Sequence, residues 1–123
     1  MINKMTLLQA FRAMICFLDI HYSKTLSDDL GSLLGDIQLS EDGVTWDPTA
    51  WNDWVVACEK RESITPQEAF KAVFNFLNAY YVRTSCSSSD IKSLLDDMVC
   101  DRDDTLLQSR VWNIWIECVR KNT

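Results

Sequence analysis

Apolar side chains recur along this chain at steps of three and four residues. One such series consists of Leu8, Phe11, Ile15, Leu18 and Tyr22. A later series consists of Phe70, Phe74, Leu77 and Tyr81. Steps of this size place side chains on one face of an α-helix, whereas a half-buried strand would alternate strictly. The pattern therefore predicts one amphipathic helix early in each half of the chain.

Two shorter apolar series follow in each half and predict a second and a third helix. The second helices begin at Ser27 and Ser88 and bury Leu30, Leu33, Leu34 and Ile37, and Ile91, Leu94, Leu95 and Met98. The third helices, the first of which begins at Asp47 and Pro48, bury Trp51, Trp54, Val55 and Cys58, and Trp112, Trp115, Ile116 and Val119. Tryptophans three residues apart on such a face suit a core better than a ligand-stacking site. No segment shows the pattern of a strand hairpin, so we expect helices alone.

The first helix of each half opens on a capping signal. Thr6 is followed three residues later by Gln9, and Thr65 by Glu68. In such a capping box the Thr oxygen accepts a hydrogen bond from a free N–H group, and the Gln or Glu side chain bonds back to the Thr N–H. Pro66 is tolerated at the first helical position, because its missing N–H would have no partner there.

The two halves are related by duplication. Residues 6–25 and 65–84 are identical at eight of twenty positions, and residues 27–37 and 88–98 at six of eleven. The Trp-Asn-x-Trp segment at 51–54 also matches the one at 112–115. Unrelated segments would agree at roughly 6% of positions. The sequence therefore indicates one three-helix unit that is present twice.

We expect an all-α fold of about six helices, in which two tandem three-helix repeats are fused into one pseudo-two-fold bundle. The repeats span about residues 5–61 and 64–122, within a single domain of residues 1–123. A unit of about 60 residues buries too little apolar surface to be comfortably stable alone. The link at residues 60–67 contains no glycine, which favours one fused core over two independent units.

Cysteine usage and hydropathy indicate a cytoplasmic protein. The five cysteines are odd in number and irregularly spaced, which fits neither a disulfide framework nor a Cys-x-x-Cys motif. We expect most of them to be small buried hydrophobes, with Cys86 the most exposed. We expect no signal peptide, and no apolar run reaches the ~20 residues of a membrane span.

The net charge of −6 and the pI of about 4.6 narrow the choice of partner. Binding to nucleic acid or to anionic lipid depends on Lys and Arg, so we expect neither as a direct ligand. An acidic surface instead favours a basic partner through electrostatic steering. A modest acidic excess also keeps a protein soluble without any particular partner, and charge alone leaves that alternative open.

The sequence offers little that points to catalysis. His21, the one histidine, lies near the end of an amphipathic helix and is best explained as a partly exposed structural residue. The sequence has no metal-ligand spacing, and its three glycines make a phosphate-binding loop implausible. Neighbours such as Asp28 and Asp29 diverge by about 100° on a helix, which favours solvated faces over acid–base pairs. We expect no enzyme activity, no metal and no cofactor.

What remains is a surface rich in carboxylates, concentrated in the first repeat. The candidate contact residues are Asp28, Asp29, Asp36, Glu41, Asp42, Asp47 and Asp53. The corresponding loop of the second repeat also carries acids, which Arg102 partly offsets. A rim of carboxylates on a rigid helical scaffold suits a protein surface rich in Lys and Arg, because charge-assisted pairs speed association and fix register.

The first repeat, which reads AFRAMICFLDIHYSKTLSDDLGSLLGDI and continues through DG to DPTAWNDW, resembles the immunity proteins (CdiI type) of bacterial contact-dependent growth inhibition systems. The resemblance covers residues 6–59, and the second repeat follows more loosely. It implies a cytosolic protein that binds the C-terminal toxin domain of a CdiA protein and blocks its active site or its contact with its target. Such toxins are commonly nucleases, often acting on transfer RNA. The resemblance implies no catalytic residues and places the acidic positions of the matching block at the interface.

The second repeat departs from this block, since Asp28 corresponds to Ser89 and Asp53 to Ile114. The departure favours the first repeat as the contact surface. We therefore expect a toxin-neutralising protein that acts by steric and electrostatic occlusion, with one copy per toxin domain. A function of another class also fits the residues, namely an acidic helical adaptor or assembly protein whose basic partner is not a toxin.

Overall fold

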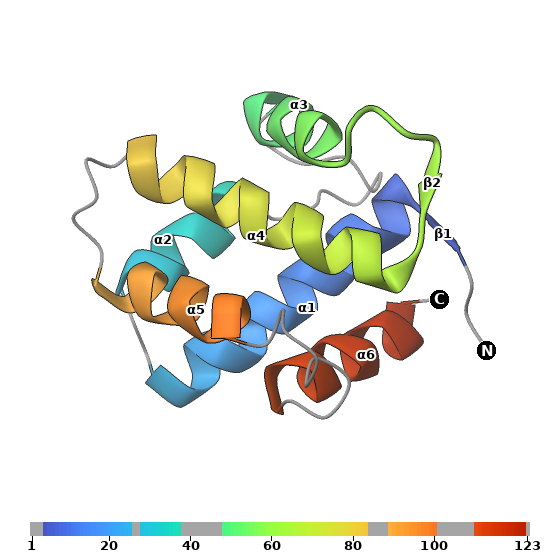
Figure 1. The fold of residues 1–123 in the computed structure, drawn as a ribbon. Helices are drawn as coiled ribbons and strands as arrows, with labels where there is room; N and C mark the ends of the chain where they lie inside the picture. The colour runs from blue at the N-terminus through green and yellow to red at the C-terminus, as the bar shows by residue number, and fades with distance from the viewer. Residues whose placement is uncertain (1–3, 26–27, 38–47, 84–88, 101–109, 123) are drawn as a thin grey trace.

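The computed structural model describes residues 4–25, 28–37, 48–83, 89–100 and 110–122 (Figure 1). Within these ranges the helices are α1 (Leu7–Thr25), α2 (Asp28–Ile37), α3 (Pro48–Ala57), α4 (Pro66–Arg83), α5 (Ser89–Cys100) and α6 (Arg110–Asn122). Two short strands, β1 (Met5–Thr6) and β2 (Ser63–Ile64), lie just before α1 and α4, respectively. The predicted all-α fold of about six helices, three in each repeat, is confirmed.

The capping boxes at the starts of α1 and α4 form as predicted. The Thr6 N–H donates to Gln9 Oε1 at 2.9 Å, and the Gln9 N–H donates to Thr6 Oγ1 at 3.1 Å. The same two bonds join Thr65 and Glu68, at 2.9 and 3.1 Å. Pro66 is the first residue of α4. Local sequence signals therefore set where these two helices begin.

The two repeats meet at a pair of strands that the sequence pattern does not predict. β1 and β2 run antiparallel, with Met5 opposite Ile64 and Thr6 opposite Ser63. The expectation of helices alone is wrong at this point, because strands of two residues are too short to show alternation. Met5 and Ile64 are equivalent positions of the two repeats, and both are buried. The pseudo-two-fold axis therefore passes through this pair.

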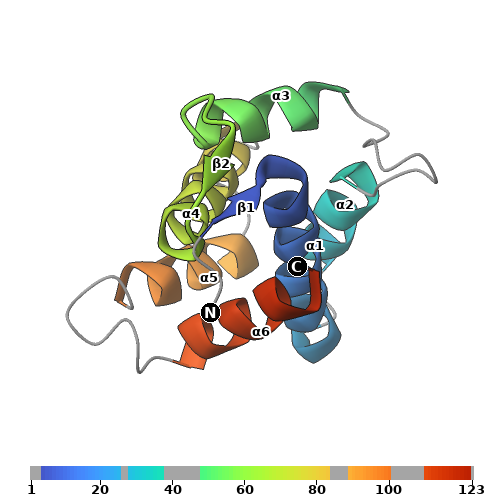
Figure 2. The ribbon, with the colours of Figure 1, turned by 90° about the vertical axis from the view of Figure 1, so that its right-hand side faces the viewer.

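The third helix of each repeat packs chiefly against the first helix of the other repeat. α6 lies along α1, and α3 lies along α4, on opposite sides of the fold (Figures 1 and 2). The middle helices, α2 and α5, contact each other and the first helix of their own repeat. Neither repeat alone therefore contains the helix against which its own third helix packs.

Trp54 of α3 shows how closely the two repeats are joined. Its Nε1 donates a hydrogen bond to the Leu7 carbonyl of the same repeat at 2.9 Å. Its ring also packs edge-on against Phe76 of the other repeat, with centroids 6.1 Å apart. The second repeat makes the same hydrogen bond at 3.0 Å and the same ring contact at 5.8 Å, through Trp115, Pro66 and Phe17. Each indole therefore contacts the first helices of both repeats.

The buried face of α1 is wider than the predicted stripe. Met14 and Phe17 are fully buried although neither belongs to the predicted series, whereas Leu8 and Ile15 are only half-buried. The reason is that both α2 and α6 pack against α1, so a single stripe does not describe its contacts. By contrast, every predicted core residue of α2 and α5 is buried.

The chain turns sharply at the end of α3. The Lys60 N–H donates to the Val55 carbonyl and the Glu59 N–H to the Val56 carbonyl, each at 2.9 Å, which is the Schellman arrangement of a helix end. Glu59 and Lys60 have positive φ angles of 59° and 58°, a region where glycine is usual. This turn leads the chain directly into β2 and across to the second repeat.

The two buried indoles provide a test of this architecture. We expect Trp54→Ala and Trp115→Ala each to lower the free energy of unfolding by roughly 3–5 kcal/mol, because each leaves a cavity at the junction of the repeats. Urea unfolding followed by far-UV circular dichroism measures the loss. Trp51→Ala, at a half-buried position of the same helix, is the matched control and should cost clearly less. Equal losses at positions 51 and 54 would contradict the bridging role of Trp54.

Candidate functional site

The structure describes part of the acidic surface selected from the sequence. Asp28 is exposed at the first position of α2. Asp29 and Asp36 also lie in α2, but their side chains are outside the described part of the chain. Also outside the described residues are Glu41, Asp42 and Asp47. The grouping of these acids into one surface therefore stays a prediction.

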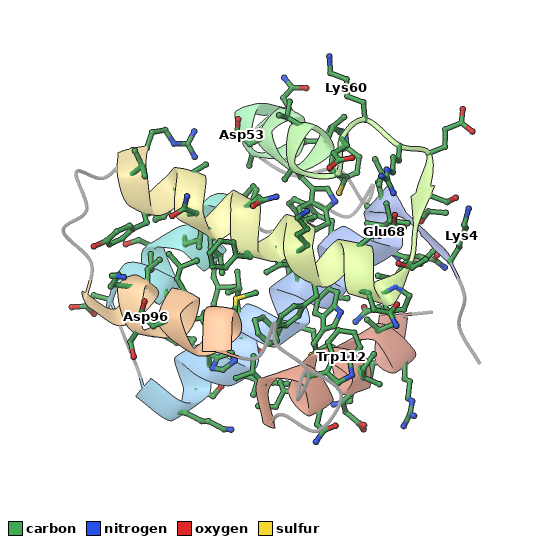
Figure 3. The ribbon with its side chains drawn as sticks, in the orientation of Figure 1. Lys4, Asp53, Lys60, Glu68, Asp96 and Trp112 are labelled. Atoms are coloured by element: carbon green, nitrogen blue, oxygen red, sulfur yellow. The ribbon has the colours of Figure 1, made fainter. Side chains whose placement is uncertain are left out.

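Asp53, the remaining candidate, lies on α3 in an ion pair. Its Oδ2 accepts a hydrogen bond from Arg83 Nη1 at 2.8 Å, and both side chains stay partly exposed. Figure 3 shows Asp53 on the side of α3 toward the last turn of α4. The Arg83 guanidinium also lies 6.0 Å from the centroid of the Tyr80 ring. The charge of Asp53 is thus largely balanced within the molecule.

Asp28 and Asp53 do not belong to one compact cluster. Asp28 begins α2, whereas Ile37, at the other end of that helix, lines a cavity together with Asp53. Because a helix rises about 1.5 Å per residue, the two ends of α2 are roughly 13 Å apart. Asp28 and Asp53, the two candidate acids whose side chains the structure describes, therefore do not converge as a catalytic carboxylate pair would.

The solvent-facing side of α2, which we call the α2 outer face, consists of Asp28, Ser32 and Gly35. These three residues are exposed and lie four and three positions apart, so they share one side of the helix. The opposite side is buried and consists of Leu30, Leu33, Leu34 and Ile37. The helix contains three Asp residues and no Lys or Arg. The α2 outer face is therefore acidic and carries no long side chain.

The equivalent face of the second repeat is built differently. Gly31 and Gly35 of α2 correspond to Lys92 and Asp96 of α5. Lys92 Nζ and Asp96 Oδ1 form an ion pair at 2.8 Å, and this hydrogen bond raises the pKa of the Lys92 ammonium. Two long, mutually paired side chains therefore cover α5 at the positions where α2 has two glycines, of which Gly35 is the exposed one.

The two glycines of α2 are explained differently. A Cβ atom at Gly31 would lie 3.0 Å from the Tyr22 ring and would push that ring aside, so close packing against α1 favours glycine there. A Cβ atom at Gly35 would have no atom of the described residues within 4 Å. Glycine in an exposed helix interior costs roughly 1 kcal/mol relative to alanine. Packing among the described residues does not account for this cost at Gly35, and glycine would allow another molecule to approach the helix backbone closely there.

A cavity of about 140 Å³ opens beside the Asp53–Arg83 pair. Its apolar floor consists of Leu33, Ile37, Ala50 and Phe76. In the second repeat the apolar Ile114 occupies the position of Asp53. His21, which corresponds to Tyr80, packs against Phe17 with ring centroids 4.7 Å apart. His21 is half-buried in this contact, the structural position predicted for it. The Asp53–Arg83 pair at this rim therefore has no acidic counterpart at the symmetry-related position.

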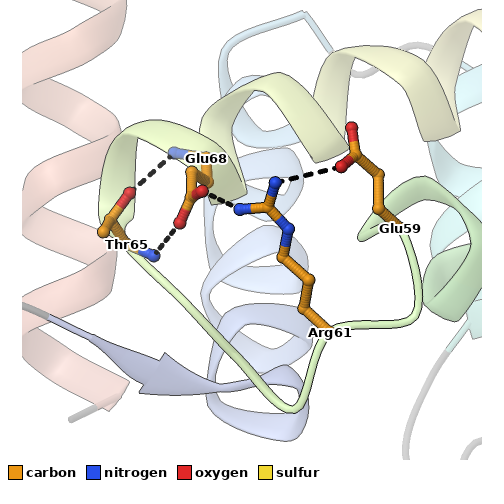
Figure 4. A network of polar contacts seen from close by, with 4 residues as sticks. All are labelled: Glu59, Arg61, Thr65 and Glu68. Carbon is orange, nitrogen blue, oxygen red and sulfur yellow. Dashed lines mark hydrogen bonds and ion pairs between the residues drawn. The ribbon is translucent and has the colours of Figure 1, made fainter.

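A second cavity, of about 130 Å³, lies between the end of α3, β2 and the first half of α4. Arg61 lines it and donates hydrogen bonds to Glu59, at 3.1 Å, and to Glu68 (Figure 4). Glu68 also caps α4 through its contact with Thr65. Both carboxylates at this cavity are therefore engaged in contacts that hold the turn between the repeats.

Other chemistry is limited in the part of the chain that the structure describes. No group of three or more His, Cys, Asp and Glu side chains among these residues could hold a metal ion. No helix within the described ranges is long and apolar enough to cross a membrane. Burial raises the pKa of the Cys58 thiol to about 12, which makes this thiol a poor nucleophile at neutral pH.

Comparison of the chain with protein-family models, with curated proteins and with solved structures finds no match. The α2 outer face and the cavity beside Asp53 are therefore the features from which we infer a function. Sequence reasoning found the acids of α2 but missed the contrast between its glycines and the Lys92–Asp96 pair. The signal was available, because aligning the two repeats places Gly31 and Gly35 opposite these charged residues.

The two glycines should respond in opposite ways to the same small substitution. We expect Gly35→Ala to raise the free energy of unfolding by roughly 0.5–1 kcal/mol, because the position is helical, exposed and open. We expect Gly31→Ala to lower it, because the added methyl group meets the Tyr22 ring. Urea unfolding of both variants measures the difference, and a loss of stability in Gly35→Ala would show that this position is not open.

Proposed function

We propose that this protein is an immunity protein of the contact-dependent growth inhibition type. It binds the C-terminal toxin domain of a CdiA protein in the cytoplasm, in a 1:1 complex, and neutralises it by steric and electrostatic occlusion. The toxin domain is a basic nuclease that acts on transfer RNA. The α2 outer face and the neighbouring acids of the first repeat form the contact surface.

The observation that carries this proposal is the structure of the α2 outer face. Asp28 supplies an exposed carboxylate, and Ser32 and Gly35 leave the helix backbone uncovered. No basic residue of α2 repels a cationic partner. The equivalent face of α5 lacks these properties, because the Lys92–Asp96 pair covers it. The difference supports the first repeat as the binding side.

Electrostatics supports a basic partner. A nuclease must attract phosphate groups to its active site, so that site carries an excess of positive charge. An acidic protein is attracted to such a site, and complementary charge speeds association and fixes orientation. The net charge of −6 has the sign that this role requires. We expect an affinity in the nanomolar range or tighter, about −12 kcal/mol or more.

The cavity beside Asp53 would be a separate anchoring point, because Leu33 and Ile37 line it from the side of α2 opposite the outer face. Its volume of about 140 Å³ and its apolar floor suit one apolar side chain of the partner. Such a buried anchor commonly contributes more to binding than the charged rim around it. The Asp53–Arg83 pair at the rim is partly exposed and offers polar groups to the residues that flank the anchor.

An acidic helical adaptor with a basic partner that is not a toxin would use the same surface. A pull-down from the host bacterium separates the two functions. Recovery of a basic nuclease domain supports the immunity function, and recovery of a housekeeping complex supports the adaptor.

Charge reversal tests the role of the acidic surface. We expect the triple variant Asp29→Lys, Asp42→Lys and Asp47→Lys to abolish protection of cells that express the toxin domain. The sequence predicts solvated positions for these acids, and solvated charges contribute little to stability, so helix content and melting temperature should stay nearly unchanged. Growth assays and circular dichroism measure the two effects, and full protection by the triple variant would place the interface elsewhere.

A long side chain at the bare position tests the α2 outer face directly. We expect Gly35→Arg to weaken toxin binding by roughly 100-fold, about 2.7 kcal/mol, because it blocks close approach and adds a repulsive charge. Asp96→Arg makes a comparable change on the equivalent face of α5 and should leave binding within a few-fold. Calorimetric titration of both variants decides the matter, and equal losses would show that the two faces are not distinguished.

A further inference from the structure

Two cysteines face each other across the junction of the repeats. Cys16 lies in α1 and Cys118 in α6, the helix pair in which the last helix of the chain packs along the first. The Cys118 thiol forms a side-chain hydrogen bond with the Cys16 thiol. Both are free cysteines; Cys118 is fully buried and Cys16 is half-buried. The two thiols therefore lie close together, and Cys16 is the more exposed of the two residues.

The fold itself does not require thiols at these positions. The pseudo-two-fold places Asn75 at the position equivalent to Cys16, and Ala57 at the position equivalent to Cys118. Asn75 and Ala57 both line the cavity of about 130 Å³ between α3 and α4. The same helix pairing is therefore built once with two neighbouring cysteines and once with an amide, a methyl group and a cavity. Packing alone does not explain the cysteine pair.

We propose that Cys16 and Cys118 form an oxidisable dithiol site, in which a hydroperoxide converts the two thiols into a disulfide that links α1 to α6.

The chemistry proceeds in two balanced steps. The Cys16 sulfur attacks hydrogen peroxide, its S–H proton leaves with the departing hydroxide as water, and a sulfenic acid forms on Cys16. The Cys118 sulfur then attacks the Cys16 sulfur, the S–OH bond breaks, and a second water leaves with the Cys118 proton. Each sulfur loses one electron, and the two electrons reduce the peroxide O–O bond. A small dithiol reductant reverses the change by thiol–disulfide exchange.

Burial assigns the order of the two cysteines. Burial, followed by the hydrogen bond to Cys16, raises the pKa of the Cys118 thiol, so Cys118 carries little thiolate in water. Cys16 is the residue that a solute can reach, and it reacts first. Cys118 lies close to Cys16 and serves as the resolving thiol.

Tryptic peptides offer a direct readout of the link. Cleavage at Arg12, Lys24, Arg110 and Arg120 puts Cys16 in peptide 13–24 and Cys118 in peptide 111–120, each as the single cysteine. The folded full-length protein is treated with hydrogen peroxide, its remaining thiols are blocked with iodoacetamide at the moment of denaturation, and the digest is analysed by mass spectrometry. We expect the linked pair of peptides to be the main oxidised product and to disappear after dithiothreitol.

Thermal unfolding provides the second readout. A disulfide that closes a loop of about 100 residues should raise the melting temperature of the peroxide-treated protein by roughly 10 °C relative to the reduced protein. Cys16→Ser and Cys118→Ala should each abolish this shift and the linked peptides, whatever their own starting stability. Cys58→Ala, which removes another buried cysteine, should keep both. Recovery of Cys16 and Cys118 as separately blocked peptides, or a disulfide that joins either to another cysteine, would overturn the proposal.

Discussion

The indole N–H groups of Trp54 and Trp115 each bond to a carbonyl at the start of the first helix of their own repeat, at 2.9 and 3.0 Å. The same rings rest on phenylalanines that belong to the other repeat. A buried indole needs an acceptor for its N–H group and close packing around its ring. These two requirements together restrict how the helices around it can be placed. The packing of α3 against α4 and of α6 against α1 meets both requirements. The paired strands at Met5 and Ile64 also join the two repeats at the pseudo-two-fold axis.

This shared framework lets the two repeats carry different surfaces without changing their cores. The buried faces of α2 and α5 match residue by residue, from Leu33 and Leu94 to Ile37 and Met98. Their exposed sides differ, with an exposed Asp28 and Gly35 on one helix and the Lys92–Asp96 pair on the other. Each repeat can thus be compared with the other. Where equivalent residues differ and packing does not require the difference, we look for a contact with another molecule.

Much of the fold is readable from the sequence because its signals are local. Capping boxes such as Thr65 with Glu68 fix helix starts, and the apolar series of α2 and α5 identify their buried faces. The strand pair and the exchange of third helices depend on contacts between distant segments, and periodicity says which face is buried but not what covers it. For the same reason the sequence names Asp53 as a candidate but not its partner Arg83. The acids at 41, 42 and 47 lie outside the described residues.

The crossing of the third helices also bears on how such a chain can arise. In a polypeptide of half this length, the third helix would have no partner within the same chain. The first helix of a second copy would have to take that place. The single-unit form would therefore be an obligate homodimer with identical outer faces, held by swapped helices. Joining the two units through the short turn at Glu59 and Lys60 makes assembly independent of concentration and frees each half to evolve separately.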